Sequence, residues 1–134
     1  MSSLRIFDIA ASAMQAQNTR LNATASNLAN VDSVASSADA AYRARVPMFR
    51  AVMDAAGVAG VATTEVADSR KPAEARYEPG HPMADEQGYI YAPAINTVEE
   101  MANMISASRS YQNAVDVMST SRDLMLATLR LGRS

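Results

Sequence analysis

The sequence contains no cysteine and no tryptophan, and aromatic residues make up only 5% of it. Without cysteine there is no disulfide framework and no thiol chemistry. Hydrophobic residues reach 49% of the 134 positions, so much of the apolar content must be alanine, valine and methionine. Small side chains bury little surface each. The sequence therefore predicts one domain's worth of chain with a shallow core.

Several classes of protein are disfavoured by what is missing. No run of about 18 apolar residues occurs, so no segment is expected to span a membrane. Residues 1–14 lack a basic region followed by an apolar core, and are not expected to form a cleavable signal peptide. The net charge is −2, and the basic residues alternate with acidic ones. This pattern argues against a nucleic-acid partner.

Residues that carry chemistry are scarce. His81 is the only histidine, and it lies in a proline- and glycine-containing turn with none of the usual metal-binding neighbours. The carboxylate pairs Asp85–Glu86 and Glu99–Glu100 fall in a turn and in the first turn of a helix, where acids are structural. No phosphate-binding loop, dinucleotide motif or nucleophile elbow occurs. The sequence therefore predicts no catalytic residue, no metal site and no cofactor.

The first zone, residues 1–33, has the pattern of one long helix. No glycine or proline occurs before Pro47, and apolar residues recur in alternating steps of three and four. This row consists of Leu4, Phe7, Ala11, Met14, Asn18, Leu21, Ala25 and Leu28. The pattern predicts a helix over residues 3–30, about 42 Å long.

The third zone, residues 97–134, has the same periodicity. Its row consists of Met101, Met104, Ser108, Tyr111, Val115, Met118, Arg122, Met125 and Leu129, and Ile105 is one of several apolar residues outside it. Thr97 and Glu100 have the spacing of a capping box, which predicts a helix start with Thr97 as the cap. Gly132 is expected to end this second helix.

The middle zone, residues 34–96, holds all five prolines and four of the five glycines. Four short segments have strand-like composition or alternation. They are 42–46, 58–67, 74–79 and 88–93. The serine- and alanine-rich segment 33–40 is expected to be a flexible connector. The predicted fold is mainly α, with a small β-rich insert between two long terminal helices.

Charge is distributed unevenly along the chain. The first zone has two arginines against two aspartates, and the third has four arginines against four acidic residues. The middle zone has six basic and eight acidic residues, which accounts for the net −2. Sparsely charged helices are suited to burial against other protein surfaces. Asn27 and Asn30 are therefore expected at a subunit contact, although a simple helix end capped by Asn30 or Asp32 fits the spacing equally well.

Two blocks of the sequence are distinctive. The first is residues 6–36, whose predicted helix ends with 27-NLAN-30. The second is residues 77–132, which contains YEPGHP, DEQGYIY, INTVEEM and ISASRSYQ. Together these blocks resemble the flagellar rod–hook axial family, whereas residues 50–76 match only loosely.

The resemblance implies a structural component of the proximal rod, the drive shaft of the flagellar basal body. The long terminal helices of many subunits would pack as a coiled coil in a helical, tubular assembly around a central export channel. The chain would reach the periplasmic rod through the flagellar type III export apparatus without a cleaved signal peptide. Implied partners are other copies of itself, the rod proteins FlgB, FlgF and FlgG, and the rod adaptor FliE, with the MS ring protein FliF as a further candidate. No nucleic acid and no membrane insertion is expected.

The expected subunit-interface residues come from both helices and were chosen by periodicity. They are Leu4, Phe7, Met14, Leu21, Asn27, Leu28, Asn30, Met101, Ile105, Tyr111, Val115, Met118, Met125 and Leu129. The apolar members are expected to face one another, within a subunit or between neighbours. The alternative is a cytoplasmic coiled-coil adaptor or secretion chaperone, which needs the same helices but leaves the YEPGHP–GYIYAP insert unexplained.

Overall fold

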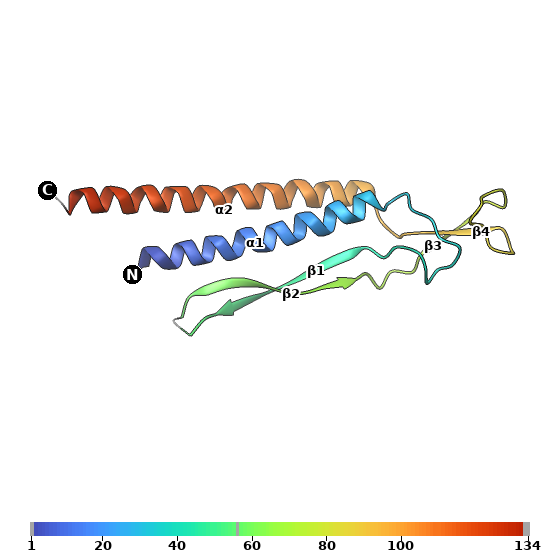
Figure 1. The fold of residues 1–134 in the computed structure, drawn as a ribbon, viewed down its shortest axis with the longest axis horizontal. Helices are drawn as coiled ribbons and strands as arrows, with labels where there is room; N and C mark the ends of the chain where they lie inside the picture. Colours follow the sequence, from blue (N-terminus) through green and yellow to red (C-terminus); the bar gives the residue numbers. More distant parts are fainter. Residues whose placement is uncertain (1, 56, 133–134) are drawn as a thin grey trace.

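Two long helices lie side by side and antiparallel, with a β-hairpin against one of them (Figure 1). This computed structural model describes residues 2–55 and 57–132, with side chains from residue 5 onward. Helix α1 (Ser2–Ala29) lies between helix α2 (Thr97–Leu131) and the hairpin of β1 (Arg45–Met53) and β2 (Ala59–Asp68). The prediction of a mainly α fold with a small β-rich insert is confirmed.

Both predicted helices form, within one residue of their expected bounds. Helix α1 ends at Ala29, and the side-chain amide of the next residue, Asn30, donates a hydrogen bond to the Ser26 carbonyl oxygen at 2.8 Å. The Asn30 backbone N–H also bonds to the Ser26 oxygen, at 3.2 Å. Helix α2 ends before Gly132, whose N–H bonds to the Thr128 carbonyl oxygen at 3.0 Å.

The expected cap of the second helix is wrong by one residue. Asn96 is the N-cap, because its extended backbone lets the side-chain oxygen accept from the N–H groups of Val98 and Glu99 at 3.0 and 3.2 Å. Thr97 is the first helical residue instead. The Glu100 carboxylate is directed to Asn27 of α1, and accepts a hydrogen bond from its side chain.

The β1–β2 hairpin is antiparallel, paired from Arg45↔Asp68 to Met53↔Ala59 with a bulge at Met48/Phe49. The strand expected at 58–67 is confirmed. The alternation at 42–46 places a strand too early, because Tyr42 hydrogen-bonds through its hydroxyl to Ser26 and Asn27 on α1 before β1 begins.

The two shorter predicted strands pair with each other as a second ribbon, β3 (Glu74–Tyr77) and β4 (Tyr89–Ala92). Figure 1 shows this ribbon at the end of the molecule where α1 ends and α2 begins. The rings of Tyr77 and Tyr89 meet edge to face, with centroids 5.3 Å apart. Asp85 closes the connecting loop by accepting from the backbone N–H groups of Gln87 and Tyr89, both at 2.9 Å.

The segment expected to be a flexible connector is anchored to this ribbon. Ala35 exchanges two backbone hydrogen bonds with Tyr91, both at 2.9 Å. Ala35, Ile90 and Ala92 are buried at this junction, and Ile90 is the largest fully buried side chain among the described residues. Almost every other buried apolar residue is alanine. The predicted shallow core is therefore confirmed.

Gly88 provides a test of the ribbon. Its φ of +83° is unfavourable for other residues, and a Cβ there would lie 2.9 Å from the Tyr77 ring and 3.0 Å from the Pro79 Cβ. We expect Gly88→Ala to destabilise the ribbon by about 1–3 kcal/mol, measured as faster amide hydrogen exchange at Tyr91. Gly80→Ala is the matched control, because a Cβ at that position would meet no other atom within 4 Å. Equal exchange rates at Tyr91 in the two variants would contradict the predicted strain at Gly88.

Asp85 makes the stability of the β3–β4 loop depend on pH. The N–H of Tyr89 is the main cause that lowers the pKa of Asp85 below its usual 3.8, and the N–H of Gln87 and the hydroxyl of Tyr91 add to it. Since the folded pKa is lowered, this carboxylate stabilises the loop above pH 3.8 and loses that contribution as pH falls through the folded pKa. An NMR titration should therefore show the Tyr89 amide proton responding only below pH 3.8. Asp85→Asn should abolish the response.

Candidate subunit interface

Helix α1 carries parallel rows of residues, each row stepping by three and four along the chain. One row, here called the hairpin row, faces the strands and consists of Ser12, Ala16, Thr19, Ala23 and Ser26. The Ser12 hydroxyl accepts a hydrogen bond from the Val61 N–H at 3.2 Å. Ala16 and Ala23 are buried. Small side chains in this row let the hairpin approach the helix closely.

A second row of α1 is displaced by one residue and faces α2. This helix row consists of Ile6, Ala10, Ala13, Gln17, Arg20, Thr24 and Asn27. The guanidinium of Arg20 donates to the Asn103 side-chain oxygen at 3.2 Å. The corresponding row of α2 consists of Glu100, Asn103, Ala107, Ser110, Ala114, Val117 and Ser121. Ala107 is fully buried. The contact between the two helices is thus made largely of small and polar side chains.

A third row of α1, one residue further on, is the apolar row that the sequence indicated. This free row consists of Phe7, Ala11, Met14, Asn18, Leu21, Ala25 and Leu28. The three smaller residues are exposed, and the four large apolar ones are half-buried beside the α1–α2 contact. Leu4 belongs to the same row, but its side chain lies outside the described residues. Phe7, Met14, Leu21 and Leu28 therefore lie beside the α1–α2 contact and away from the hairpin, where they are only partly covered.

The apolar row predicted for α2 is displaced in the same way, by one residue from the row that faces α1. Met118 and Met125 are half-buried, whereas Tyr111 and Val115 are 37% and 40% exposed. Met101 and Leu129, near the two ends of the row, are exposed, and so is Ile105 on the outer side of α2. This free row of α2 is also left largely uncovered within the chain.

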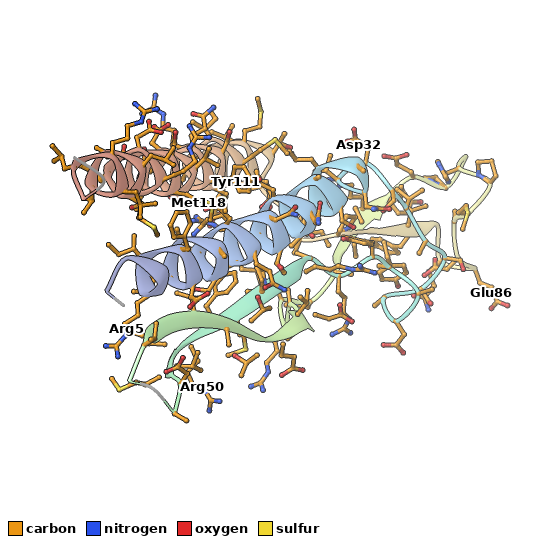
Figure 2. The ribbon with its side chains drawn as sticks, turned by 60° about the vertical axis from the view of Figure 1, so that its left-hand side comes forward. Arg5, Asp32, Arg50, Glu86, Tyr111 and Met118 are labelled. Atoms are coloured by element: carbon orange, nitrogen blue, oxygen red, sulfur yellow. The ribbon has the colours of Figure 1, made fainter. Side chains whose placement is uncertain are left out.

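The two free rows form one surface. In an antiparallel pair, the residues that follow the facing row by one position lie on the same side of both helices. Figure 2 shows Tyr111 and Met118 along the edge of α2 that adjoins α1. The structure therefore brings Phe7, Met14, Leu21 and Leu28 beside Tyr111, Met118 and Met125 on one apolar side of the molecule, opposite the hairpin.

Asn27 joins three parts of the fold and is only 2% exposed. Its side-chain oxygen accepts from the Arg45 N–H at 2.7 Å and from the Tyr42 hydroxyl at 3.1 Å. Its amide nitrogen donates to the Arg45 carbonyl oxygen at 3.1 Å and to the Glu100 carboxylate at 3.2 Å. These bonds use all four hydrogen-bonding positions of the amide. One residue thus connects α1 to the start of β1 and to the first turn of α2.

The asparagine pair that the sequence singled out has contacts inside the chain. Asn30 hydrogen-bonds to the last turn of its own helix, as expected from the alternative in which Asn30 simply caps the helix end. The role of Asn27 and Asn30 at a subunit contact stays a prediction. The sequence did not predict the cross-helix hydrogen bonds of Arg20, Asn103 and Glu100. The periodic pattern of one helix does not show which polar residue of the other helix will lie opposite. The steps of three and four at Arg20, Thr24 and Asn27 were the only available signal.

Substitution of Asn27 by aspartate tests this junction. Asn27→Asp cannot donate to Glu100 and places two carboxylates at hydrogen-bonding distance. We expect a loss of stability on the order of 3 kcal/mol, measured by urea unfolding. Asn27→Asp combined with Glu100→Gln should recover much of the loss, because the glutamine amide can donate to the aspartate. Asn22→Asp, at an exposed position of the same helix, is the control. An unfolding midpoint of Asn27→Asp equal to that of this control would contradict the assignment.

Chemistry-bearing groups do not converge on a reaction site. The His81 Nδ1 accepts a hydrogen bond from the Met83 N–H at 3.1 Å within its own turn. Across residues 2–55 and 57–132, no three histidine or carboxylate side chains gather closely enough to hold a metal ion. Neither helix in the described part of the chain has the length and apolar character that crossing a membrane requires. The extended apolar surface of the helix pair is the main candidate for function.

Two protein-family models match the helical parts of the chain. The family described as "Flagella basal body rod protein" matches residues 7–36, which cover most of α1. The family described as "Flagellar basal body rod FlgEFG protein C-terminal" matches residues 86–131, which cover β4 and α2. The first match includes the free row of α1 from Phe7 onward, and the second includes the rows of α2.

Curated relatives match along their whole length. "Flagellar basal-body rod protein FlgC" of Escherichia coli O6:H1 is 47% identical over 134 residues, covering 99% of this chain and 100% of the relative. The proteins of the same name from Salmonella typhimurium and Yersinia enterocolitica are 47% and 46% identical, with the same coverage. The chain therefore belongs to the FlgC family of flagellar basal-body rod proteins, which are structural proteins and not enzymes.

Proposed function

We propose that this chain is a subunit of the proximal rod that transmits torque as part of the drive shaft and forms part of the export channel wall. Membership of a rod-protein family implies assembly with other rod components. The observation that supports the finer assignment is the pair of free rows on α1 and α2. Their large apolar side chains are arranged for helix–helix packing, yet within residues 2–55 and 57–132 they are only partly covered.

Torque transmission follows from how such surfaces assemble. Head-to-tail contacts that repeat by a screw operation build an open helical tube. Closely packed side chains resist compression and shear, because each displaced group meets its neighbours within a fraction of an ångström. In this proposal the free rows supply the contacts between subunits. Phe7, Met14, Leu21 and Leu28 would meet helix residues of a neighbouring subunit.

The channel wall is assigned to the outer side of α2. Helix α2 contacts α1 but no strand among the described residues, so its far side is open. A polar row lies there, consisting of Arg109, Gln112, Asp116, Ser119 and Asp123, all of them exposed. A polar lining suits a water-filled passage for exported chains.

The proposed partners are other copies of the chain, the rod proteins FlgB, FlgF and FlgG, and the adaptor FliE, with FliF at the membrane ring. The chain would lie in the periplasmic part of the basal body after passing through the flagellar export apparatus. Tracing the chain by cryo-electron microscopy of purified basal bodies tests this placement. Density for α1 and α2 in the proximal rod supports it, whereas a soluble cytoplasmic dimer absent from the rod would overturn it.

Charges placed in the free row should block assembly. Leu21→Asp with Leu28→Asp puts two carboxylates into the proposed contact, where each would lose its hydration without gaining a partner. We expect loss of swimming in soft agar and no rods in basal-body preparations. Circular dichroism of the purified variant should show unchanged helix content, because both side chains are only half-buried in the single chain.

The matched control is Asn22→Asp with Ala29→Asp, which adds the same charge with the same seven-residue spacing at exposed positions one residue away. This control should swim and assemble rods. Normal motility of the Leu21→Asp, Leu28→Asp variant would falsify the packing role of the free row.

A further inference from the structure

An apolar groove lies on the side of the helix pair that faces away from the free rows. Its lining residues come from both helices, and the largest are Ile6, Ile9 and Val117. Its volume is about 250 Å³, and no charged residue lines it. Ile9 belongs to the hairpin side of α1, since it precedes Ser12 by three residues. The groove therefore opens on the side of α1 that carries the hairpin, between the first turns of α1 and the second half of α2.

The apolar surface of this groove continues along α2. Leu124 follows Val117 by seven residues, so both lie on one side of the helix. They are 65% and 50% exposed, respectively. Figure 1 shows that the C-terminal turns of α2 extend past the start of α1, so the row that faces α1 continues where α1 no longer covers it. The groove and Leu124 together form an open strip with two-turn spacing.

The free row of α1 has the complementary properties. Phe7, Met14, Leu21 and Leu28 also repeat every seven residues, and no residue of this row from Phe7 to Leu28 is charged. Two neutral apolar strips with the same repeat can interdigitate as helices do in coiled coils. A partner with charged side chains would have to bury them in a groove that offers no counter-charge. The observed chemistry thus fits the chain's own free row better than a charged partner.

Geometry also prevents the two strips from meeting within one molecule, because they lie on opposite sides of the same helix pair. A contact between unlike patches is heterologous, and repeating it around an axis generates a ring or a helix of subunits. We propose that the free row of α1 in one copy packs into the groove at Ile6, Ile9 and Val117 of a second copy. This deepens the proposed function and rests on it, since it assigns the lateral contact between copies in the rod wall.

The absence of native cysteine makes a direct test possible. Met14→Cys and Val117→Cys are co-expressed as two separate single-cysteine chains, and assembled basal bodies are treated with a short bismaleimide cross-linker. We expect a covalent dimer that contains one chain of each kind. Rods with only Met14→Cys, or only Val117→Cys, should give no dimer, because neither patch meets itself in a heterologous contact.

Glu86→Cys replaces Met14→Cys in the control pair. Figure 2 places Glu86 at the ribbon end, far from Arg5 at the start of α1, so this pair should give no dimer. If either Met14→Cys or Val117→Cys prevents assembly, Leu21→Cys with Ala13→Cys provides a second pair from the same two surfaces. Formation of the mixed dimer by either pair supports the proposal.

The outcomes separate this inference from the proposed function. Assembled rods that contain the chain but give no mixed dimer with either pair overturn the lateral contact and leave the rod position intact. A cross-link from Val117→Cys to a different rod protein, identified by mass spectrometry, overturns the choice of a second copy as the occupant. Absence of the unsubstituted chain from basal bodies overturns both.

Discussion

Helix α1 is the only element in the described part of the chain that contacts both the other helix and the hairpin. The fold therefore depends on how the surface of this one helix is divided among its contacts. Residues at steps of three and four form a row along the helix, and a row displaced by one residue lies about 100° around the helix axis. One row meets the hairpin and the next meets α2, so the free row is the least covered along the length of α1. The chemistry of each row reflects this division.

The two inner contacts use mainly small and polar residues, whereas Phe7, Met14, Leu21 and Leu28 lie in the partly covered free row. Small side chains in these rows, such as Ala10, Ala16 and Ala23, let the backbones approach closely. Each of them buries little surface. Hydrogen bonds supply the specificity that such contacts lack, and Asn27 makes four of them. A buried amide with every position satisfied favours one register strongly, because any slip leaves unpaired groups in a low-dielectric site. The hydrogen bond from Arg20 to Asn103 adds a second polar contact between the two helices, two turns of α1 away.

The sequence predicted the elements of the fold well and their pairing less well. Helix bounds followed from the absence of glycine and proline and from the length of the periodic pattern. The same periodicity identified Phe7, Met14, Leu21 and Leu28 as one row, but could not tell which row faces the partner helix in the same chain. Hydrophobic content favoured the larger residues, whereas the internal contact uses the row one residue earlier. Asparagine and threonine both suit the N-cap position, so the sequence could not decide between Asn96 and Thr97. The extended backbone of Asn96 decides it, and that conformation is set by the preceding loop.

This inversion of the usual arrangement has a mechanical consequence for the proposed rod. A subunit that buried its large apolar residues internally would be stable alone and would meet its neighbours through a weaker, more polar surface. Here the internal contacts are shallow, and the surface with the greatest apolar content is directed outward. Assembly would then bury the larger side chains between subunits, where a shaft under torsion must resist sliding. The cohesion of each subunit and the cohesion of the tube would come from the same α1 helix, on adjacent rows. A load on the free row of α1 would pass directly to the helix that holds the hairpin and α2 in register through Asn27.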